Sequence, residues 1–283
     1  MSKISFDDLK GKVCVLTGGA GVIGASLVRG LASAGIKTAI VDLNEEAAVR
    51  LATEIEKEYG VTTIGVGASV LDKDSLIAAK KTINEKLGKI NFLINGAGGN
   101  SPAATTQLEE MLPEDKTHLE KTFYGLNMDG FQKVYDLNFK GTLLPTMVFT
   151  MDMLDAGKGG VLNISSMNAY KPLTKIPAYS AAKASINNFT EWLAVHLAKT
   201  GIRVNAIAPG FFLTNQNRFL LTDEKTGEAT PRGKKIISST PMGKYGEPED
   251  LNGTMLYLLS DISSFVTGIC IPVDGGYSAY GGV

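Results

Sequence analysis

The sequence predicts an α/β fold in which one parallel sheet carries helices on both of its faces. Short apolar, β-rich runs alternate regularly with longer helical patterns along the chain. The chain has 283 residues, 44% of them hydrophobic, which is enough for one large domain with a buried core. A glycine-rich turn follows directly after the first apolar run. These observations indicate a single doubly wound domain over residues 1–283.

The first half of the chain predicts four strands with three helices between them. The expected strands are residues 12–17, 38–42, 62–67 and 90–95. The expected helices are residues 25–34, 44–59 and 72–87. Asn44 can cap the second helix, because its side chain accepts hydrogen bonds from free backbone N–H groups.

The second half predicts three further strands and two long irregular connections. The expected strands are residues 160–165, 202–208 and 268–273. Helices are expected at residues 131–155, 184–199 and 248–260, the first of them kinked at Pro145. The irregular connections are an insert over about 101–130 and a segment over about 211–245 that we expect to form a lid over cofactor and substrate. Long connections inside a compact domain are often functional.

The turn over residues 17–24 has the features of a dinucleotide site. Gly19, Gly21 and Gly24 fit the spacing G-x-G-x-x-G between a strand and a helix. Asp42 ends the next strand, where a carboxylate can accept hydrogen bonds from ribose hydroxyls and repel a 2′-phosphate. The pattern therefore predicts NAD(H) in preference to NADP(H), against the alternative of a flexible turn without a ligand.

Tyr179 and Lys183 are a candidate acid–base pair. They are four residues apart in a predicted helix and therefore share one face. A phenol titrates near ~10, and a neighbouring ammonium is expected to lower that pKa. The alternative is a tyrosine and a lysine on an ordinary helix surface.

Taken together, several motifs resemble the short-chain dehydrogenase/reductase family over nearly the whole chain. They occur in the family's order at residues 17–24, 95–98, 137–141, 166–183, 209–210 and 273–276. Val22 and Gly96 stand where the family has a glycine and an asparagine, and Ser69 stands where it has an acidic residue. The resemblance implies a Rossmann fold and catalytic roles for Asn138, Ser166, Tyr179 and Lys183.

The resemblance also implies a set of cofactor contacts at the carboxyl ends of the strands. They are Thr17, Gly18, Gly19, Gly21, Val22, Ile23, Gly24, Asp42, Leu43, Ser69, Val70, Asn95, Gly96, Ala97, Gly98, Tyr179, Lys183, Pro209, Gly210 and Phe212.

Within that family the chain resembles the D-mannonate oxidoreductase (fructuronate reductase) branch, on residues 164–178, 206–218, 273–283 and the insert. This implies reversible reduction of a sugar-acid ketone, D-fructuronate to D-mannonate. The expected substrate contacts are Asn100, Ser166, Asn168, Tyr179 and Arg218. Arg218 is the leading partner for the carboxylate, with Lys171 and Lys175 as rivals.

Other functions stay open. They are another polyol or sugar-acid dehydrogenase, similar to gluconate 5-dehydrogenase, a 3-oxoacyl thioester reductase, and a non-catalytic dinucleotide-sensing protein.

Composition argues against several partners. The net charge is −1 without a basic block, so nucleic-acid binding is not expected. There is no apolar run of about eighteen residues, no apolar signal region and no cysteine or histidine cluster. We therefore expect a cytoplasmic protein without a membrane span or a metal. The helices over 131–155 and 177–199 are more apolar than solvent-facing helices should be. The family resemblance implies that these helices pack between subunits of a homotetramer.

Overall fold

The computed structural model describes residues 5–213, 221–223 and 226–282. All seven of its strands pair in parallel in one sheet, in the order β3-β2-β1-β4-β5-β6-β7. The strands are β1 Val13–Thr17, β2 Lys37–Asp42, β3 Thr63–Gly67, β4 Phe92–Asn95, β5 Gly159–Ile164, β6 Ile202–Pro209 and β7 Cys270–Val273. The predicted doubly wound α/β fold is confirmed.

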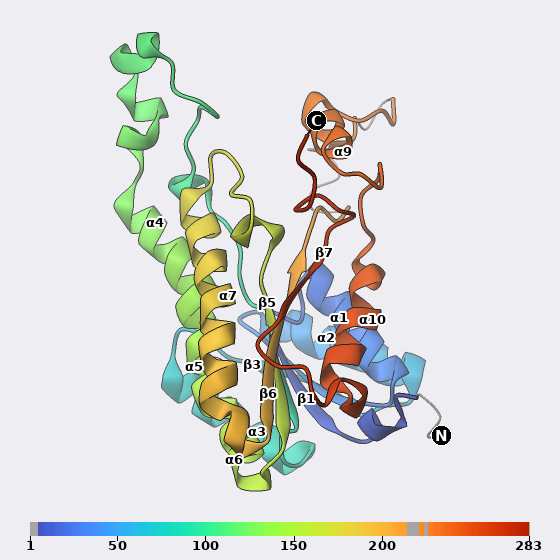
Figure 1. The fold of residues 1–283 in the computed structure, drawn as a ribbon. Helices are drawn as coiled ribbons and strands as arrows, with labels where there is room; N and C mark the ends of the chain where they lie inside the picture. Colours follow the sequence, from blue (N-terminus) through green and yellow to red (C-terminus); the bar gives the residue numbers. More distant parts are fainter. Residues whose placement is uncertain (1–4, 214–220, 224–225, 283) are drawn as a thin grey trace.

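Helices cover both faces of the sheet, as Figure 1 shows. One apolar core lies beneath α1 Val22–Ser33, α2 Glu45–Tyr59 and α10 Asn252–Leu259. The other lies beneath α3 Lys73–Lys86, α5 Gly141–Phe149, α6 Met151–Ala156 and α7 Pro177–Leu197. In the part of the chain that the structure describes, no helix combines the length and the apolar character needed to cross a membrane.

Side-chain caps explain where two helices begin. The Asn44 side chain accepts a hydrogen bond from Ala47 N at 3.0 Å, and α2 starts at the next residue. It ends at Gly60, which has the left-handed conformation typical of a helix terminus. The Asp72 carboxylate accepts from the N–H of Ser75 in the same way and starts α3.

The long helix predicted over 131–155 is divided, but not at Pro145. Helix α4 (Met128–Tyr135) runs into a π-helical turn, η6 (Asp136–Lys140), and α5 then continues through Pro145 to Phe149. The π turn centres on Asn138, whose side chain bonds to the loop after β4. The irregularity therefore lies where a buried polar side chain needs partners, a common setting for π turns.

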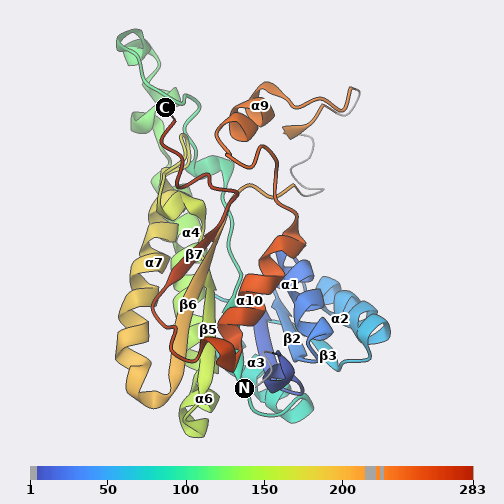
Figure 2. The ribbon, with the colours of Figure 1, turned by 45° about the vertical axis from the view of Figure 1, so that its right-hand side comes forward.

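The irregular segments lie together at the carboxyl edge of the sheet. In Figures 1 and 2 the insert, helix α9 (Pro231–Ser238) and the C-terminus lie at one end of the molecule, and the N-terminus lies near the other. Every parallel strand points its carboxyl end the same way, so the connections after β4 and β6 gather at this edge.

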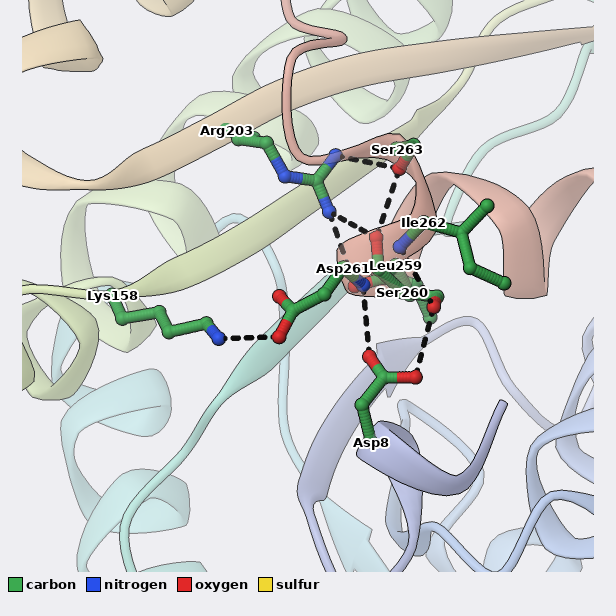
Figure 3. Close-up of polar contacts among 8 residues, drawn as sticks. All are labelled: Asp8, Lys158, Arg203, Leu259, Ser260, Asp261, Ile262 and Ser263. Atoms are coloured by element: carbon green, nitrogen blue, oxygen red, sulfur yellow. Dashed lines mark hydrogen bonds and ion pairs between the residues drawn. The ribbon is translucent and has the colours of Figure 1, made fainter. Parts of the chain in front are cut away.

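A polar network braces the opposite part of the fold (Figure 3). The Arg203 guanidinium donates to the carbonyls of Leu259 and Ser260, each at 3.1 Å, and to Ser263 Oγ at 3.0 Å. The Asp8 carboxylate accepts from Ser260 Oγ at 2.9 Å. The network thus ties the N-terminal residues and β6 to the turn after α10, and we assign it to stability.

Candidate active site

A cavity of about 780 Å³ opens at the carboxyl edge of the sheet. Its walls come from the turns that follow β1, β2, β3, β4, β5 and β6, with α7 along one side. The strand order reverses between β1 and β4, and this cavity lies at that switch point. Such a crevice is where doubly wound sheets bind dinucleotides.

The glycine-rich turn packs directly against the loop after β4. Gly18 has φ +67°, and a Cβ there would lie 2.7 Å from the Cα of Ala97. Helix α1 begins at Val22 without a side-chain cap on its first N–H groups, and Val22 and Ile23 line the cavity. An uncapped helix N-terminus offers N–H donors and a positive dipole end, which fit the pyrophosphate of a dinucleotide.

The Asp42 carboxylate is held at the rim of this cavity. Its Oδ2 accepts from Ala20 N at 3.1 Å, and its Oδ1 accepts from Asn44 N at 3.0 Å. Asp42 lines the cavity and is only partly buried, so its remaining lone pairs can receive hydroxyl donors. This geometry fits the ribose hydroxyls of an adenosine.

Most of the expected cofactor contacts line the cavity. They are Gly18, Gly21, Val22, Ile23, Gly24, Asp42, Leu43, Ser69, Val70, Gly96, Ala97, Gly98, Tyr179, Lys183, Pro209, Gly210 and Phe212.

The other three expected contacts, Thr17, Gly19 and Asn95, are buried beneath this lining. Thr17 Oγ1 accepts from the N–H groups of Gly96 and Ala97, at 3.2 and 3.3 Å. These three residues therefore lie where they can shape the turns, and the facing backbone forms the walls.

The Asn95 amide begins a buried chain of polar contacts across the sheet. Its Nδ2 donates to Thr146 Oγ1 and to Asn163 Oδ1, both at 2.9 Å. Asn163 Nδ2 in turn donates to Thr190 Oγ1 at 2.9 Å. The chain joins α5, β4, β5 and α7 directly under the site, where buried amides require such partners.

Sequence reasoning missed part of the lining, most of it apolar. The missed residues are Leu27, Val41, Ala68, Leu71, Leu137, Ile164 and Ser165. Several are neighbours of predicted contacts at strand ends. Their position was a usable signal, but an apolar residue next to a strand is normally interpreted as core.

The four expected catalytic residues converge at one end of the cavity. Tyr179 and Lys183 lie on the first turns of α7, and the Lys183 Nζ is 5.5 Å from the centroid of the Tyr179 ring. Ser166 follows β5 and lines the same wall as both. Asn138 is fully buried behind that wall, and a Cβ on Gly98 would lie 2.6 Å from its Oδ1.

Burial controls the titration of the tyrosine and the lysine. It raises the pKa of Tyr179 above its ordinary value, and a hydrogen bond with Ser166 partly offsets that effect. Burial also lowers the pKa of Lys183 to about 8. The net shift of the Tyr179 pKa is therefore upward, opposite to the direction expected from the neighbouring Lys183, because burial is the largest cause. The Lys183 ammonium lies near the ring face and donates to the carbonyl of Ile164 at 2.8 Å.

The expected substrate residues divide into three groups. Ser166 and Tyr179 line the cavity, and Asn168 lies buried next to Ser166, where its backbone N–H donates to Ser166 Oγ at 3.2 Å. Asn100 is exposed, lies outside the cavity lining and donates to Thr105 Oγ1 at 3.3 Å. Arg218 lies outside the described residues.

The two rival cations also differ in their surroundings. The Lys171 ammonium donates to the backbone carbonyl of Tyr280 near the C-terminus. Lys175 lies in the loop that leads into α7, four residues before Tyr179. Among the described residues, no three histidine, cysteine, aspartate or glutamate side chains gather as they would around a metal ion.

Comparison with protein-family models identifies the family of the chain. The family model described as enoyl-(acyl carrier protein) reductase matches residues 18–278, which include the glycine-rich turn and the Tyr179 helix. The chain belongs to the short-chain dehydrogenase/reductase family. It is therefore an oxidoreductase of that family, and the expectation of an enzyme is confirmed.

Three relatives resemble the chain over almost its full length. It is 49% identical to the uncharacterized oxidoreductase UxuB of Bacillus subtilis, over 98% of each chain. A solved NAD-bound structure from Haemophilus influenzae, a candidate D-mannonate oxidoreductase, shares 47% identity with a TM-score of 0.92, covering 97% and 98% of the two chains. NAD⁺-bound xylitol dehydrogenase shares 30% identity with a TM-score of 0.81, covering 95% of this chain and 99% of the other.

Proposed function

We propose that this enzyme transfers a hydride reversibly between NAD(H) and the ketone of a sugar acid, with D-fructuronate and D-mannonate as the substrate pair. The observation that carries the reaction type is the cluster of partly buried Tyr179 with buried Ser166 and Lys183 in the lining of one cavity. The similarity to a candidate D-mannonate oxidoreductase with bound NAD supports the choice of substrate and cofactor.

In this proposal Tyr179 supplies the proton during reduction. Burial raises its pKa, so the phenol stays protonated at neutral pH and can donate to the oxygen of the reduced ketone. Ser166 lies beside the phenol and donates a hydrogen bond to the same oxygen. When bound, the nicotinamide supplies the hydride.

Lys183 and Asn138 complete the proposed machinery. The Lys183 ammonium has one partner at the carbonyl of Ile164, and its other N–H donors can hold the ribose hydroxyls of the nicotinamide half. Asn138 bonds to Gly99 and to the carbonyl of Val134, which fixes the loop in front of Lys183. We assign Asn138 a positioning role.

Asn168 supports a polar substrate. Its side chain is 4% exposed, and its Oδ1 has no hydrogen-bond partner in the described part of the chain. A buried acceptor without a partner is costly. Asn168 lies behind the cavity lining next to Ser166, and we propose that a substrate hydroxyl reaches its Oδ1 from there. The acyl chain of a 3-oxoacyl thioester would not satisfy this acceptor, so Asn168 favours a polyhydroxylated substrate. Arg218 remains a proposed partner for the carboxylate.

Exposed apolar side chains support the proposal of a homotetramer. Met147 on α5 and Trp192 and Val195 on α7 are 53%, 57% and 80% exposed. Large apolar side chains gathered on neighbouring helices are typical of surfaces that a partner covers. A second copy of the chain is the partner we propose, and light scattering at micromolar concentration tests it, since a stable monomer would exclude the tetramer.

A spectrophotometric screen tests the proposed reaction. NADH oxidation is followed at equal concentrations of D-fructuronate, D-tagaturonate, 5-ketogluconate and D-fructose. We expect the highest kcat/KM with D-fructuronate. A clear preference for 5-ketogluconate would support a gluconate 5-dehydrogenase instead. Activity with none of the sugar acids, but with a 3-oxoacyl thioester, would overturn the proposal.

A further inference from the structure

Three segments meet around one exposed carboxylate at the carboxyl edge of the sheet. Glu109 belongs to the insert, and its Oε2 lies 2.7 Å from the Nζ of Lys235 on α9. The insert is the connection after β4, and α9 belongs to the connection after β6. This ion pair therefore joins two connections that are distant in sequence at the carboxyl edge of the sheet.

The third segment is the loop that leads into the Tyr179 helix. The backbone N–H of Thr106, three residues before Glu109, donates to the carbonyl of Lys175 at 2.9 Å. Lys175 has φ +72°, and within the described ranges it is the one residue other than glycine with a positive φ. An unstrained loop would not place a lysine in this conformation, and such local strain is concentrated at functional sites.

The charges at this junction are unbalanced. The hydrogen bond and charge of Lys235, followed by the charges of Lys175 and Arg232, hold the pKa of Glu109 below its ordinary value. Glu110 is a second carboxylate near Lys235. Lys175 and Arg232 thus add positive charge around the Glu109–Lys235 pair, and Glu110 adds negative charge.

The junction lies outside the cavity lining, at the same edge of the sheet. Phe211 lines the cavity and packs edge-on against Tyr277, with ring centroids 5.2 Å apart. Burial raises the pKa of the Tyr277 hydroxyl, and the charge of Lys235 lowers it. On the other side, four residues of chain separate Lys175 from Tyr179, a span of at most ~14 Å.

We propose that Glu109 occupies the position of a substrate carboxylate, and that Lys175 and Lys235 are the cations that select an acidic substrate. When the substrate binds, its carboxylate replaces that of Glu109 as the partner of these cations. This inference rests on the proposed sugar-acid reaction. The inference extends the proposed reaction by naming the residues that distinguish an acid from a neutral ketose or polyol.

The proposal predicts opposite effects for the two members of the ion pair. Glu109→Gln removes the competing carboxylate and should tighten binding of D-mannonate about 3-fold to 10-fold. Lys235→Gln and Lys175→Gln remove cations and should each weaken the binding of D-mannonate by about 5-fold to 10-fold. Binding of D-mannonamide, which has the same hydroxyls and no charge, should change less than about 2-fold in all three variants.

Titration calorimetry of the enzyme–NADH complex measures both ligands without turnover. Lys234→Gln is the matched control, because it removes the same charge from the same helix, where Lys234 lies 4.0 Å from Glu228. Lys234→Gln should change the affinities for D-mannonate and D-mannonamide by the same small factor. If Glu109→Gln weakens binding as Lys235→Gln does, or if acid and amide change equally, the pair is only a clamp and the proposal is wrong.

This readout separates the inference from the reaction on which it rests. An enzyme that oxidises NADH with none of the sugar acids would refute the proposed function. The selection of D-mannonate over its amide, with opposite signs for Glu109 and Lys235, would still be measurable as binding.

Discussion

Asn138 and Gly99 hold each other through a reciprocal pair of hydrogen bonds. Asn138 Nδ2 donates to the carbonyl of Gly99 at 2.7 Å, and the Gly99 N–H donates back to Asn138 Oδ1 at 3.2 Å. The pair ties the π turn of the α4–α5 helix to the loop after β4. It therefore fixes the stretch of cavity wall in front of Lys183. A Cβ added at Gly98 would lie 3.4 Å from the Lys183 Nζ.

A methyl group at Gly98 should disturb this arrangement. In Gly98→Ala the added Cβ would lie 2.6 Å from Asn138 Oδ1, so the loop or the amide must move. We expect kcat/KM to fall at least about 10-fold, because positions near the reacting atoms tolerate little displacement. Gly99→Ala is the control, since a Cβ there has nothing within 4 Å. Equal losses in both variants would contradict this explanation.

Removal of the Tyr179 hydroxyl should abolish proton transfer and leave cofactor binding intact. Tyr179→Phe keeps the buried ring but has no acidic proton, so we expect kcat to fall about 10²-fold to 10⁴-fold. NADH binding, followed by its fluorescence, should change little. Substantial remaining turnover would exclude Tyr179 from the proton-transfer role.

The two directions of the reaction should differ in pH dependence. Burial raises the pKa of Tyr179, so the protonated form that reduction needs is present at neutral pH, and the phenolate that oxidation needs is scarce there. The kcat/KM for oxidation of D-mannonate should therefore rise as the pH increases from about 7 to about 10. The kcat/KM for reduction should not rise over the same range. A rise in both directions would point to a different titrating group.

The Asp42 carboxylate should control the choice between NADH and NADPH. Asp42→Asn retains an oxygen that can accept from Ala20 N, but it removes the negative charge that opposes a 2′-phosphate. We expect the ratio of kcat/KM for NADH over NADPH to fall about 10-fold. A wild-type enzyme that already prefers NADPH would show that this argument is wrong.

A buried carboxylate far from the cavity should affect stability without affecting catalysis. Asp152 on α6 lies 2.7 Å from Lys80 Nζ and 3.2 Å from Lys89 Nζ, and it accepts from Ile90 N at 3.2 Å. Burial alone would raise its pKa, but these hydrogen bonds outweigh that effect and hold the pKa below its ordinary value. The stabilisation is therefore present above the unfolded-state pKa and is lost as the pH falls through the folded-state pKa.

Asp152→Asn should lower the free energy of unfolding by roughly 2 kcal/mol at neutral pH. The difference from wild type should shrink in acid, where Asp152 becomes protonated. Urea denaturation at two pH values measures this. A difference that is constant across pH would show that the carboxylate charge does not contribute.

Local signals allowed much of the fold and the cofactor site to be predicted. Asn44 caps its helix and Asp42 ends its strand within a few residues of the patterns that indicate them. Local sequence signals could not predict contacts between segments that are far apart in the sequence. The side chain of Asn138 shifts the helix irregularity away from Pro145, and the partner of Glu109 lies 126 residues further along the chain. Asn100 follows the cofactor loop in sequence, but its side chain is exposed and donates to Thr105 of the insert instead of lining the cavity.

The π turn at Asp136–Lys140 also sets the rotational phase between the two helices that it joins. Each residue of an α-helix turns the chain by about 100° about its axis. Deleting one residue here would restore regular helical pairing and rotate α4, together with the insert before it, by about that angle relative to α5. Glu109 would then be carried away from Lys235, although the catalytic residues on β5 and α7 would be unchanged. Helical register in this one turn thus determines whether the insert reaches α9.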